Sequence, residues 1–209
     1  MGDDIESGDT AANGGTAGAD LHAALANADL IHDRQTLERA IAQMAVRVHG
    51  DYAGGVPAPG GGDDASPVFL TVMHGGLLFA AQLAVELGAL GLDLEFDYLH
   101  ATRYRGATSG GELVWKHRPA TLLRGRRVLL VDDIVDEGHT LAAVGRWCHE
   151  QGAAEVRIAA LTVKAHDRCV PGVRADYVGV EVPDRYVFGY GMDYHEKGRN
   201  LPAIYALRE

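Results

Sequence analysis

Residues 127–144 read RVLLVDDIVDEGHTLAAV. The continuous apolar run at the start of this stretch is typical of a parallel strand covered on both faces, and residues 140–153 predict a helix behind it that ends at Gly152. Asp132 and Asp133 stand where the strand would end. In an open α/β sheet the ligand crevice lies outside the carboxyl ends of the strands, so we expect both carboxylates to face it.

The sequence on both sides of this stretch alternates predicted strands and helices. Residues 68–90 predict a short apolar strand, a glycine pair and a helix. Further segments are two strands (92–104 and 155–164), a surface loop (54–67), and a mobile glycine-containing excursion with a short strand beyond it (105–115). This alternation predicts an α/β fold with a mainly parallel twisted sheet flanked by helices.

The N-terminal part of the chain predicts a tail and one more helix. Residues 1–20 contain five acidic residues, no basic residue and almost no large apolar one. We interpret them as a disordered acidic tail ahead of a single domain, residues 21–209. The apolar residues of 36–52 fall on one face of a helix that Asp33 or Thr36 could cap.

Composition and charge exclude several classes of protein. The 209 residues are 47% hydrophobic and 23% charged, as in ordinary globular proteins. The net charge of -10 argues against a nucleic-acid partner, because binding to phosphate backbones rests largely on Lys and Arg. No apolar run approaches the roughly 20 residues of a membrane helix and no secretory signal pattern is present, so we expect a cytoplasmic protein with no membrane partner. Cys148 and Cys169 lack metal-ligand or redox spacing and are expected as unpaired thiols.

The residues that follow the two aspartates predict a phosphate site. Residues 136–140 (DEGHT) lead into a helix, whose free backbone amides and positive dipole end attract anions. Gly138 allows close approach of the backbone, and the Thr140 hydroxyl can donate a hydrogen bond. Nearby carboxylates can accept from sugar hydroxyls or hold a divalent metal. A helix cap or a solvated turn would explain any one of these acids, but their combination favours a sugar phosphate.

The segment VLLVDDIVDEGHT resembles the phosphoribosyl-pyrophosphate signature of the type I phosphoribosyltransferases. Four other segments, VMHGGLLFAAQL, DYLHATRYRG, LTVKAHDR and VPDRYVFGYGMDYHEKGRNLP, are similar in order to the hypoxanthine-guanine branch of that family. The resemblance covers roughly residues 30–207 and implies the type I fold, with a small hood subdomain built from N-terminal and C-terminal segments. It also implies the reaction: the phosphoribosyl group of 5-phosphoribosyl 1-pyrophosphate passes to N9 of hypoxanthine or guanine, giving IMP or GMP and pyrophosphate, with Mg2+ as cofactor.

The resemblance further implies a role for each matching residue on the sugar-phosphate side. Asp132 and Asp133 would hold the ribose hydroxyls and the metal. The 5'-phosphate would lie on Asp136, Glu137, Gly138, His139 and Thr140. The pyrophosphate would lie against Met73, His74, Gly75 and Arg199, where relatives often have a cis peptide before the residue that matches His74.

On the base side, the resemblance makes Asp136 the general acid/base at purine N7. Lys164 would donate to the 6-oxo group, which suits an ammonium because it has donors only. The remaining matches are Tyr186 stacking on the purine, the Val187 carbonyl accepting from the base, Asp193 beside the base holding the metal, and Arg103 and Tyr104 in a flexible lid.

Four positions depart from the family pattern. His74 stands where many relatives have Lys, Arg103 where Ser is common, and Asp132 where Glu is frequent. Glu137 stands in the phosphate loop where a small hydroxyl residue is usual. Because its carboxylate would repel a phosphate, we expect the Glu137 side chain to face outward, and His139 could compensate its charge.

Two other functions fit part of the pattern. A phosphoribosyltransferase for xanthine, adenine or uracil would share the signature, but the segment from Lys164 to Arg199 favours a 6-oxopurine. A non-enzymatic regulator on the same fold would bind nucleotide and RNA. It would favour a basic surface and tolerate loss of Asp136, whereas this chain is acidic and retains Asp136. The resemblance also implies a homodimer or a homotetramer.

Overall fold

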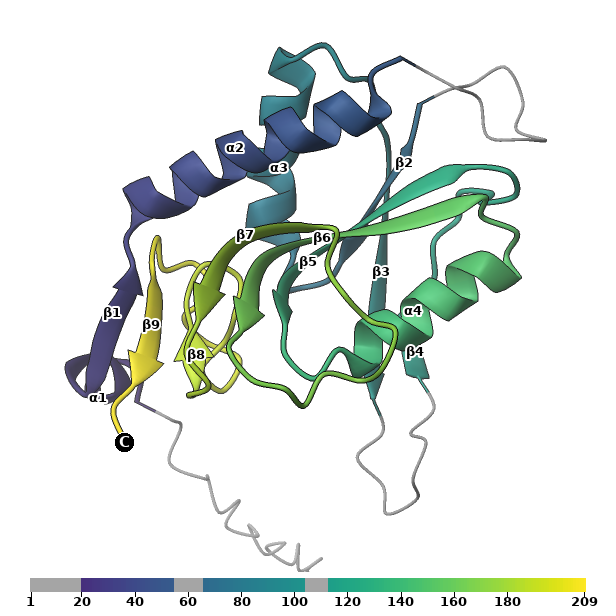
Figure 1. The fold of residues 1–209 in the computed structure, drawn as a ribbon. Helices are drawn as coiled ribbons and strands as arrows, with labels where there is room; N and C mark the ends of the chain where they lie inside the picture. The colour runs from purple at the N-terminus through teal and green to yellow at the C-terminus, as the bar shows by residue number, and fades with distance from the viewer. Residues whose placement is uncertain (1–19, 55–65, 104–112) are drawn as a thin grey trace, which may run out of the picture.

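A six-stranded sheet forms the centre of the computed structural model, which describes residues 20–54, 66–103 and 113–209 (Figure 1). Its strands are β2 (Val68–Val72), β3 (Glu95–Arg103), β4 (Leu113–His117), β5 (Arg127–Val135), β6 (Glu155–Lys164) and β7 (Tyr177–Val182). They lie in the order β4-β3-β2-β5-β6-β7. All neighbours are parallel except β3 and β4, so the predicted mainly parallel sheet is confirmed.

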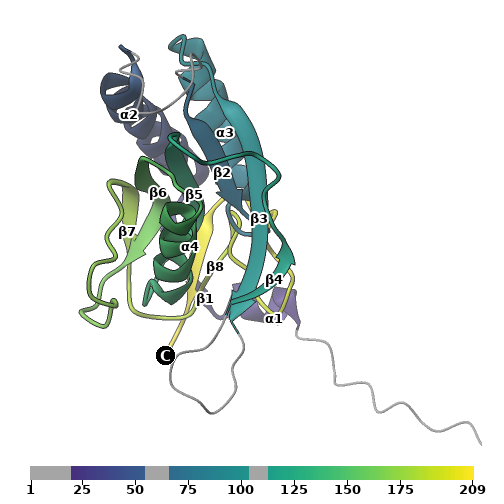
Figure 2. The same ribbon diagram turned by 90° about the vertical axis from the view of Figure 1, so that its right-hand side faces the viewer.

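Helices cover both faces of this sheet. They are α2 (Arg34–Tyr52), α3 (Leu77–Ala89) and α4 (His139–Glu150). α2 and α3 lie side by side on one face, and α4 packs on the other (Figures 1 and 2). Leu129 and Val131 of β5 belong to the core under α2 and α3. Val128 and Leu130 belong to the core under α4. The strand is therefore apolar on both sides because both sides are covered, as predicted.

Local sequence explains where the helices begin and end. The Asp33 carboxylate accepts a hydrogen bond from the Thr36 amide at 2.8 Å, so Asp33 is the N-cap of α2. Leu37 and Ile41 lie one turn apart on its buried face. α4 begins one residue before the predicted start, and Gly152 follows its end with a φ of +86°, a conformation that favours glycine.

A smaller antiparallel sheet, which we call the hood, lies beside the carboxyl ends of β6 and β7 (Figure 1). Its strands are β1 (Ala28–His32), β8 (Val187–Phe188) and β9 (Ile204–Leu207), in the order β1-β9-β8, with α1 (Leu21–Ala26) packed on them. Phe188 is fully buried in this small core. The sequence pattern does not predict α1, β1, β7 or β9, although the resemblance implies a hood built from N-terminal and C-terminal segments.

Some predictions fall on residues outside the described ranges. These residues are 1–19, 55–65 and 104–112, and they include nearly all of the predicted acidic tail, most of the predicted loop and Tyr104 of the predicted lid. No helix within the described ranges is long and apolar enough to cross a membrane. Both cysteines are free thiols, as predicted.

Candidate functional site

Two acids lie at the carboxyl end of β5. Asp132 and Asp133 are 8% and 7% exposed, and the Asp133 amide donates to the Asp132 carboxylate at 3.0 Å. Burial and the neighbouring Asp133 charge raise the pKa of Asp132, and burial raises the pKa of Asp133. No salt bridge to Lys or Arg joins either carboxylate within the described part of the chain. Such a pair favours a cation or a group that donates hydrogen bonds.

The turn after β2 lies directly against these acids. Its Met73–His74 peptide bond is cis, as the resemblance implied. A Cβ on Gly75 would overlap the Asp133 carboxylate, and a Cβ on Gly76 would lie 2.7 Å from the Val72 carbonyl oxygen. Only glycine permits this approach, so the turn exposes backbone groups beside the acids.

The loop that follows β5 opens a helix whose first amides have no side-chain cap. Gly138 is the N-cap of α4 with a φ of +76°, and no side chain of the described residues caps it. An uncapped helix start suits an anion, since its free amides and the helix dipole both attract negative charge. Glu137 is 51% exposed and its Oε2 lies 3.4 Å from Nε2 of His139. The side chain of Glu137 thus lies in solvent beside His139, in line with the expected outward orientation.

Asp136 lies between two nitrogen donors from the end of β6. Lys164 Nζ donates to Asp136 Oδ2 at 2.8 Å, and His166 Nε2 lies 2.7 Å from Asp136 Oδ1. Partial burial opposes ionisation, but the hydrogen bonds from Lys164 and His166 prevail and lower the pKa of Asp136. Asp136 is therefore a carboxylate at neutral pH, able to accept a proton.

The segment after β8 folds over the turn that follows β2. Gly191 packs on the Gly75 carbonyl, and a Cβ at Gly191 would overlap that oxygen. Arg199 donates to the Gly191 carbonyl at 2.7 Å and forms a 2.7 Å ion pair with Asp193. The charge of Arg199 also acts on Asp133, lowering its pKa against the effect of burial. The hood therefore brings Arg199 to the acids and the glycine turn.

Tyr186 and Val187 lie at the start of β8. Tyr186 is 47% exposed, and its hydroxyl donates to the Asp193 carbonyl at 3.1 Å. The side chain of Val187 is buried in the main core. Arg103 is the last residue of β3, and its side chain lies outside the described structure, as does all of Tyr104.

The three acids predicted to bind metal are not gathered into one cluster. No group of three or more His, Cys, Asp or Glu residues in the described ranges could hold a metal ion by itself. Asp193 is engaged by Arg199 and by the Glu196 amide at 2.8 Å. The adjacent Asp132 and Asp133 still fit a hard divalent cation that takes its remaining oxygen ligands from water and phosphate, which is how such ions commonly bind.

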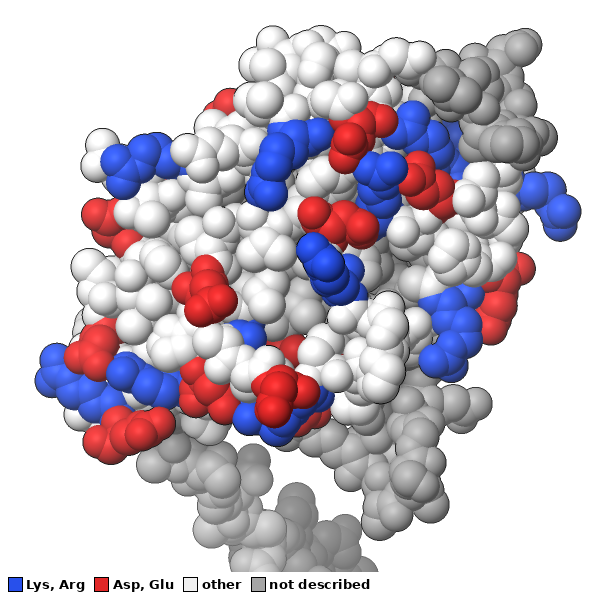
Figure 3. Space-filling model, in the orientation of Figure 1, with Lys and Arg blue, Asp and Glu red and all other residues white. Residues whose placement is uncertain are grey.

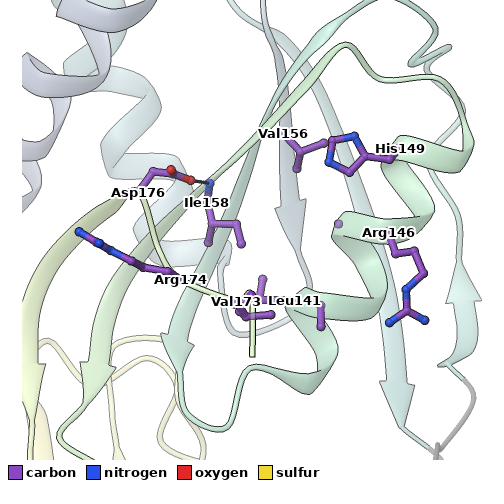
Figure 4. Close-up of a pocket in the computed structure, with 11 residues that line it drawn as sticks. Leu141, Arg146, His149, Val156, Ile158, Val173, Arg174 and Asp176 are labelled. Carbon is purple, nitrogen blue, oxygen red and sulfur yellow. Dashed lines mark hydrogen bonds between the residues drawn. The ribbon is translucent and has the colours of Figure 1, made fainter. Parts of the chain in front are cut away.

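A cavity of about 480 Å³ lies next to Asp136, Lys164 and His166, and it continues under the segment before β7. A second cavity, of about 390 Å³, lies between α4 and residues 172–176 (Figure 4). In Figure 4 the guanidinium groups of Arg146 and Arg174 point away from one another, so the second cavity has no converging cations. On the face shown in Figure 3, basic side chains lie among acidic ones and form no continuous basic surface.

The structure thus gathers most of the predicted residues at one edge of the sheet. The acids of β5, the turn at residues 73–76, the start of α4 and Lys164 converge there, and the hood adds Arg199 and Tyr186. Sequence reasoning assigned no role to His166. Its place two residues after Lys164, in the turn that follows β6, was the one available signal.

Comparisons with known proteins agree with this geometry. The chain matches the phosphoribosyl transferase domain over residues 27–196, a family that in general fits a divalent metal requirement. The hypoxanthine-guanine phosphoribosyltransferase of Streptococcus pneumoniae is 34% identical over 179 residues, covering 85% of this chain and 91% of that protein. The hypoxanthine-guanine-xanthine phosphoribosyltransferase of Tritrichomonas foetus is 31% identical, covering 86% and 91%. A ternary substrates complex of a Trypanosoma cruzi hypoxanthine phosphoribosyltransferase mutant has a TM-score of 0.78 at 28% identity, covering 88% of this chain and 97% of that one.

Proposed function

This chain belongs to the phosphoribosyl transferase domain family, and from that premise we propose that it converts hypoxanthine or guanine to IMP or GMP. The phosphoribosyl donor is 5-phosphoribosyl 1-pyrophosphate. The observation that carries the proposal is the pairing of Lys164 with Asp136 at the ends of two neighbouring parallel strands. A 6-oxopurine presents O6 and N7 on one edge, and these atoms match a cation that only donates and a carboxylate that accepts.

Asp136 acts as general base in nucleotide formation. As N9 bonds to C1 of the ribose, the bond from C1 to the pyrophosphate oxygen breaks and its electron pair leaves with pyrophosphate. The proton on N7 of the base passes to the Asp136 carboxylate, whose lowered pKa keeps it ionised beforehand. The reverse reaction uses the same group as general acid.

Lys164 and Tyr186 bind the base. The Lys164 ammonium donates to O6, and adenine would instead present an amino group that cannot accept, which favours 6-oxopurines. The exposed ring of Tyr186 stacks on the purine, and the Val187 carbonyl accepts from its far edge. Asp193 orients Arg199 through their ion pair and lies beside the base.

The sugar phosphate lies across the carboxyl end of β5 and the amino end of α4. The amides and hydroxyl of residues 136–140 bind the 5'-phosphate, and Asp132 and Asp133 accept from the ribose hydroxyls. The turn at Met73, His74 and Gly75, together with Arg199, binds pyrophosphate. Arg103 and Tyr104 belong to a lid that excludes water from the activated sugar.

Mg2+ is the proposed cofactor, and Asp132 and Asp133 would hold it. Asp193, which pairs with Arg199 in this structure, would approach the ion from the pyrophosphate side only if that pair opened. When bound, the ion supplies positive charge that offsets the charge of the leaving pyrophosphate. The two buried acids support this assignment, because no basic side chain of the described residues hydrogen-bonds to them and a buried carboxylate pair without such a partner favours a cation.

A steady-state assay with 5-phosphoribosyl 1-pyrophosphate and Mg2+ tests the function. We expect kcat/KM for hypoxanthine or guanine to exceed that for adenine and uracil by about 10⁴ or more, since a mismatched buried polar group is strongly rejected. Xanthine belongs in the same assay because one relative acts on it by name. Lys164→Ala should reduce this selectivity while the KM for the sugar phosphate stays within a few fold. If the protein bound nucleotide tightly but turned over no base, the enzymatic function would be wrong and a nucleotide-binding regulator would be favoured instead.

The same proposal includes self-association and a cytoplasmic location. Large apolar side chains of α3 and β3 are exposed in the single chain: Leu77, Leu78, Val85, Phe96 and Tyr98. An apolar surface of this kind favours a subunit contact in a homodimer or homotetramer. Light scattering of the purified protein measures the subunit number, and Val85→Glu should shift it towards the monomer. A monomeric wild type would contradict the proposal.

A further inference from the structure

We propose that His166 is a positioning residue, which holds one oxygen of Asp136 so that the other oxygen faces N7 of the base. This inference rests on the proposed function, because it assigns a purpose to the orientation of Asp136. The resemblance to the family assigned His166 no role.

The two oxygens of Asp136 have different partners. Oδ1 lies 2.7 Å from His166 Nε2, and Oδ2 accepts from Lys164 Nζ at 2.8 Å. The His166 side chain is only 4% exposed, whereas that of Asp136 is 45% exposed. His166 therefore contacts the carboxylate from its more buried side.

The backbone determines which nitrogen of His166 carries the proton. The Arg168 amide donates to His166 Nδ1 at 3.1 Å, so Nδ1 is an acceptor and bears no hydrogen. In the neutral ring the hydrogen must then be on Nε2, which donates it to Asp136 Oδ1. The His166 amide also donates to the Lys164 carbonyl at 3.0 Å, which fixes the turn that carries the ring.

Arg168 holds this arrangement from outside. Its guanidinium donates to both oxygens of Asp184, at 2.8 and 2.7 Å. The chain of contacts therefore runs from Asp184 through Arg168 and His166 to Asp136. Such support matters because the last side-chain torsion of Asp is broad and does not choose an orientation by itself.

Lys164 cannot serve as the fixed partner. In the proposed reaction its ammonium turns to O6 of the base, which frees Asp136 Oδ2 for N7. His166 is nearly buried and stays on Oδ1, so the carboxylate keeps its direction when Lys164 moves. His166 thereby lowers the barrier to proton transfer without touching the substrate.

Two substitutions at this position separate positioning from packing. His166→Leu removes the donor, whereas His166→Gln keeps an N–H donor at a similar distance from the backbone. We expect His166→Leu to lower kcat by roughly 10- to 100-fold, the loss of one hydrogen bond to a charged group, with the KM for 5-phosphoribosyl 1-pyrophosphate within twofold. His166→Gln should recover most of that loss.

His149→Leu is the matched control. His149 is exposed near the end of α4 and lines the second cavity, away from Asp136 and Lys164. The kcat of this variant should equal that of the wild type. If His166→Leu and His166→Gln were equally impaired, or if both matched the wild type, the positioning role would be wrong.

Nitrogen-15 NMR of the histidine rings tests the contact between His166 and Asp136 independently of enzymatic activity. It should show His166 with its proton on Nε2, and the Nε2 signal should shift in Asp136→Asn. A wild type that turns over no 6-oxopurine, yet shows this tautomer and shift, would overturn the proposed function and leave the contact intact. A proton on Nδ1 would overturn the positioning role whatever the activity.

Discussion

Charged residues are paired differently at the amino ends and at the carboxyl ends of β5 and β6. At the amino ends, Arg127 and Arg157 share Glu155 at 3.2 and 2.5 Å, and Arg157 also reaches Asp51 at 2.7 Å. At the carboxyl ends, Asp132 and Asp133 lie side by side in a buried place without a salt bridge in the described residues. The paired charges at the amino ends stabilise the fold. At the carboxyl ends Lys164 pairs with Asp136, but Asp132 and Asp133 are costly until a ligand neutralises them.

The largest effect should come from Asp136→Asn at the carboxyl end. The amide cannot take the N7 proton, so kcat should fall by about 10²- to 10⁴-fold, the usual contribution of general acid–base catalysis. Binding of 5-phosphoribosyl 1-pyrophosphate, measured by calorimetry, should change little. If binding collapsed while turnover per bound complex survived, Asp136 would be a binding residue and the acid/base assignment would be wrong.

Arg157→Met should have the next largest effect, and it should fall on stability alone. The change removes one ion pair from Asp51 and one from Glu155, which keep Tyr177 and Arg127 as partners. We expect a loss of about 1–3 kcal/mol, less than for a fully buried pair because Arg157 is 31% exposed. Denaturant unfolding measures the loss, and kcat/KM should be unchanged. Arg146→Met, on the exposed side of α4, is the matched control and should be neutral. If Arg157→Met lowered kcat/KM without lowering stability, the amino ends would serve activity and the assignment of a purely stabilising role to them would be wrong.

Asp132→Asn, at the carboxyl end, should raise the stability of the protein and lower its activity. Removing one of two buried carboxylates relieves their repulsion, which we expect to raise Tm by about 2–4 °C, equivalent to about 1 kcal/mol. The comparison is made in chelator-treated protein at neutral pH. Mg2+ should then stabilise the wild type more than Asp132→Asn. A variant less stable than the wild type in chelator would mean that the pair is structural.

Tyr177→Phe should cause the smallest change in stability, and this change should depend on pH. The Tyr177 hydroxyl donates to Asp51 at 2.7 Å and accepts from Arg157 at 2.9 Å, so its loss should cost about 1 kcal/mol at neutral pH. Burial, followed by the Asp51 hydrogen bond, raises the pKa of Tyr177 to about 12. The raised folded-state pKa means that this contribution is complete below pH 10 and disappears between pH 10 and 12. Unfolding curves of both proteins across that range should converge, and parallel curves would contradict the pKa shift.

The central sheet could be predicted because its signals are local. The run before Asp132 is apolar on both alternating faces, and the Asp33 cap lies within one turn of the residue it serves. The hood could not be predicted in the same way. β1 and β9 pair although they lie near opposite ends of the sequence, and the residue pattern of neither short strand indicates which strand it pairs with.

The candidate site shows the same division. Residues 136–140 and the glycine turn are contiguous motifs, so the amino-acid sequence alone indicates a phosphate site. The contact of His166 with Asp136 joins residues 30 apart, and the ion pair of Arg199 with Asp193 depends on how the hood loop bends. These geometries follow from tertiary packing, which a single sequence does not display.

The contact of Gly191 with Gly75 also sets an order of events during protein synthesis. A ribosome releases β2, β3, β5 and β6 well before it releases residues 191–199, and domains begin to fold while the chain grows. A nascent chain can therefore assemble its parallel strands while the crevice still lacks Arg199 and the segment that covers the glycine turn. Residues 191–199 therefore reach the glycine turn only after the strands that carry it have left the ribosome, and the proposed pyrophosphate contacts form after the central sheet.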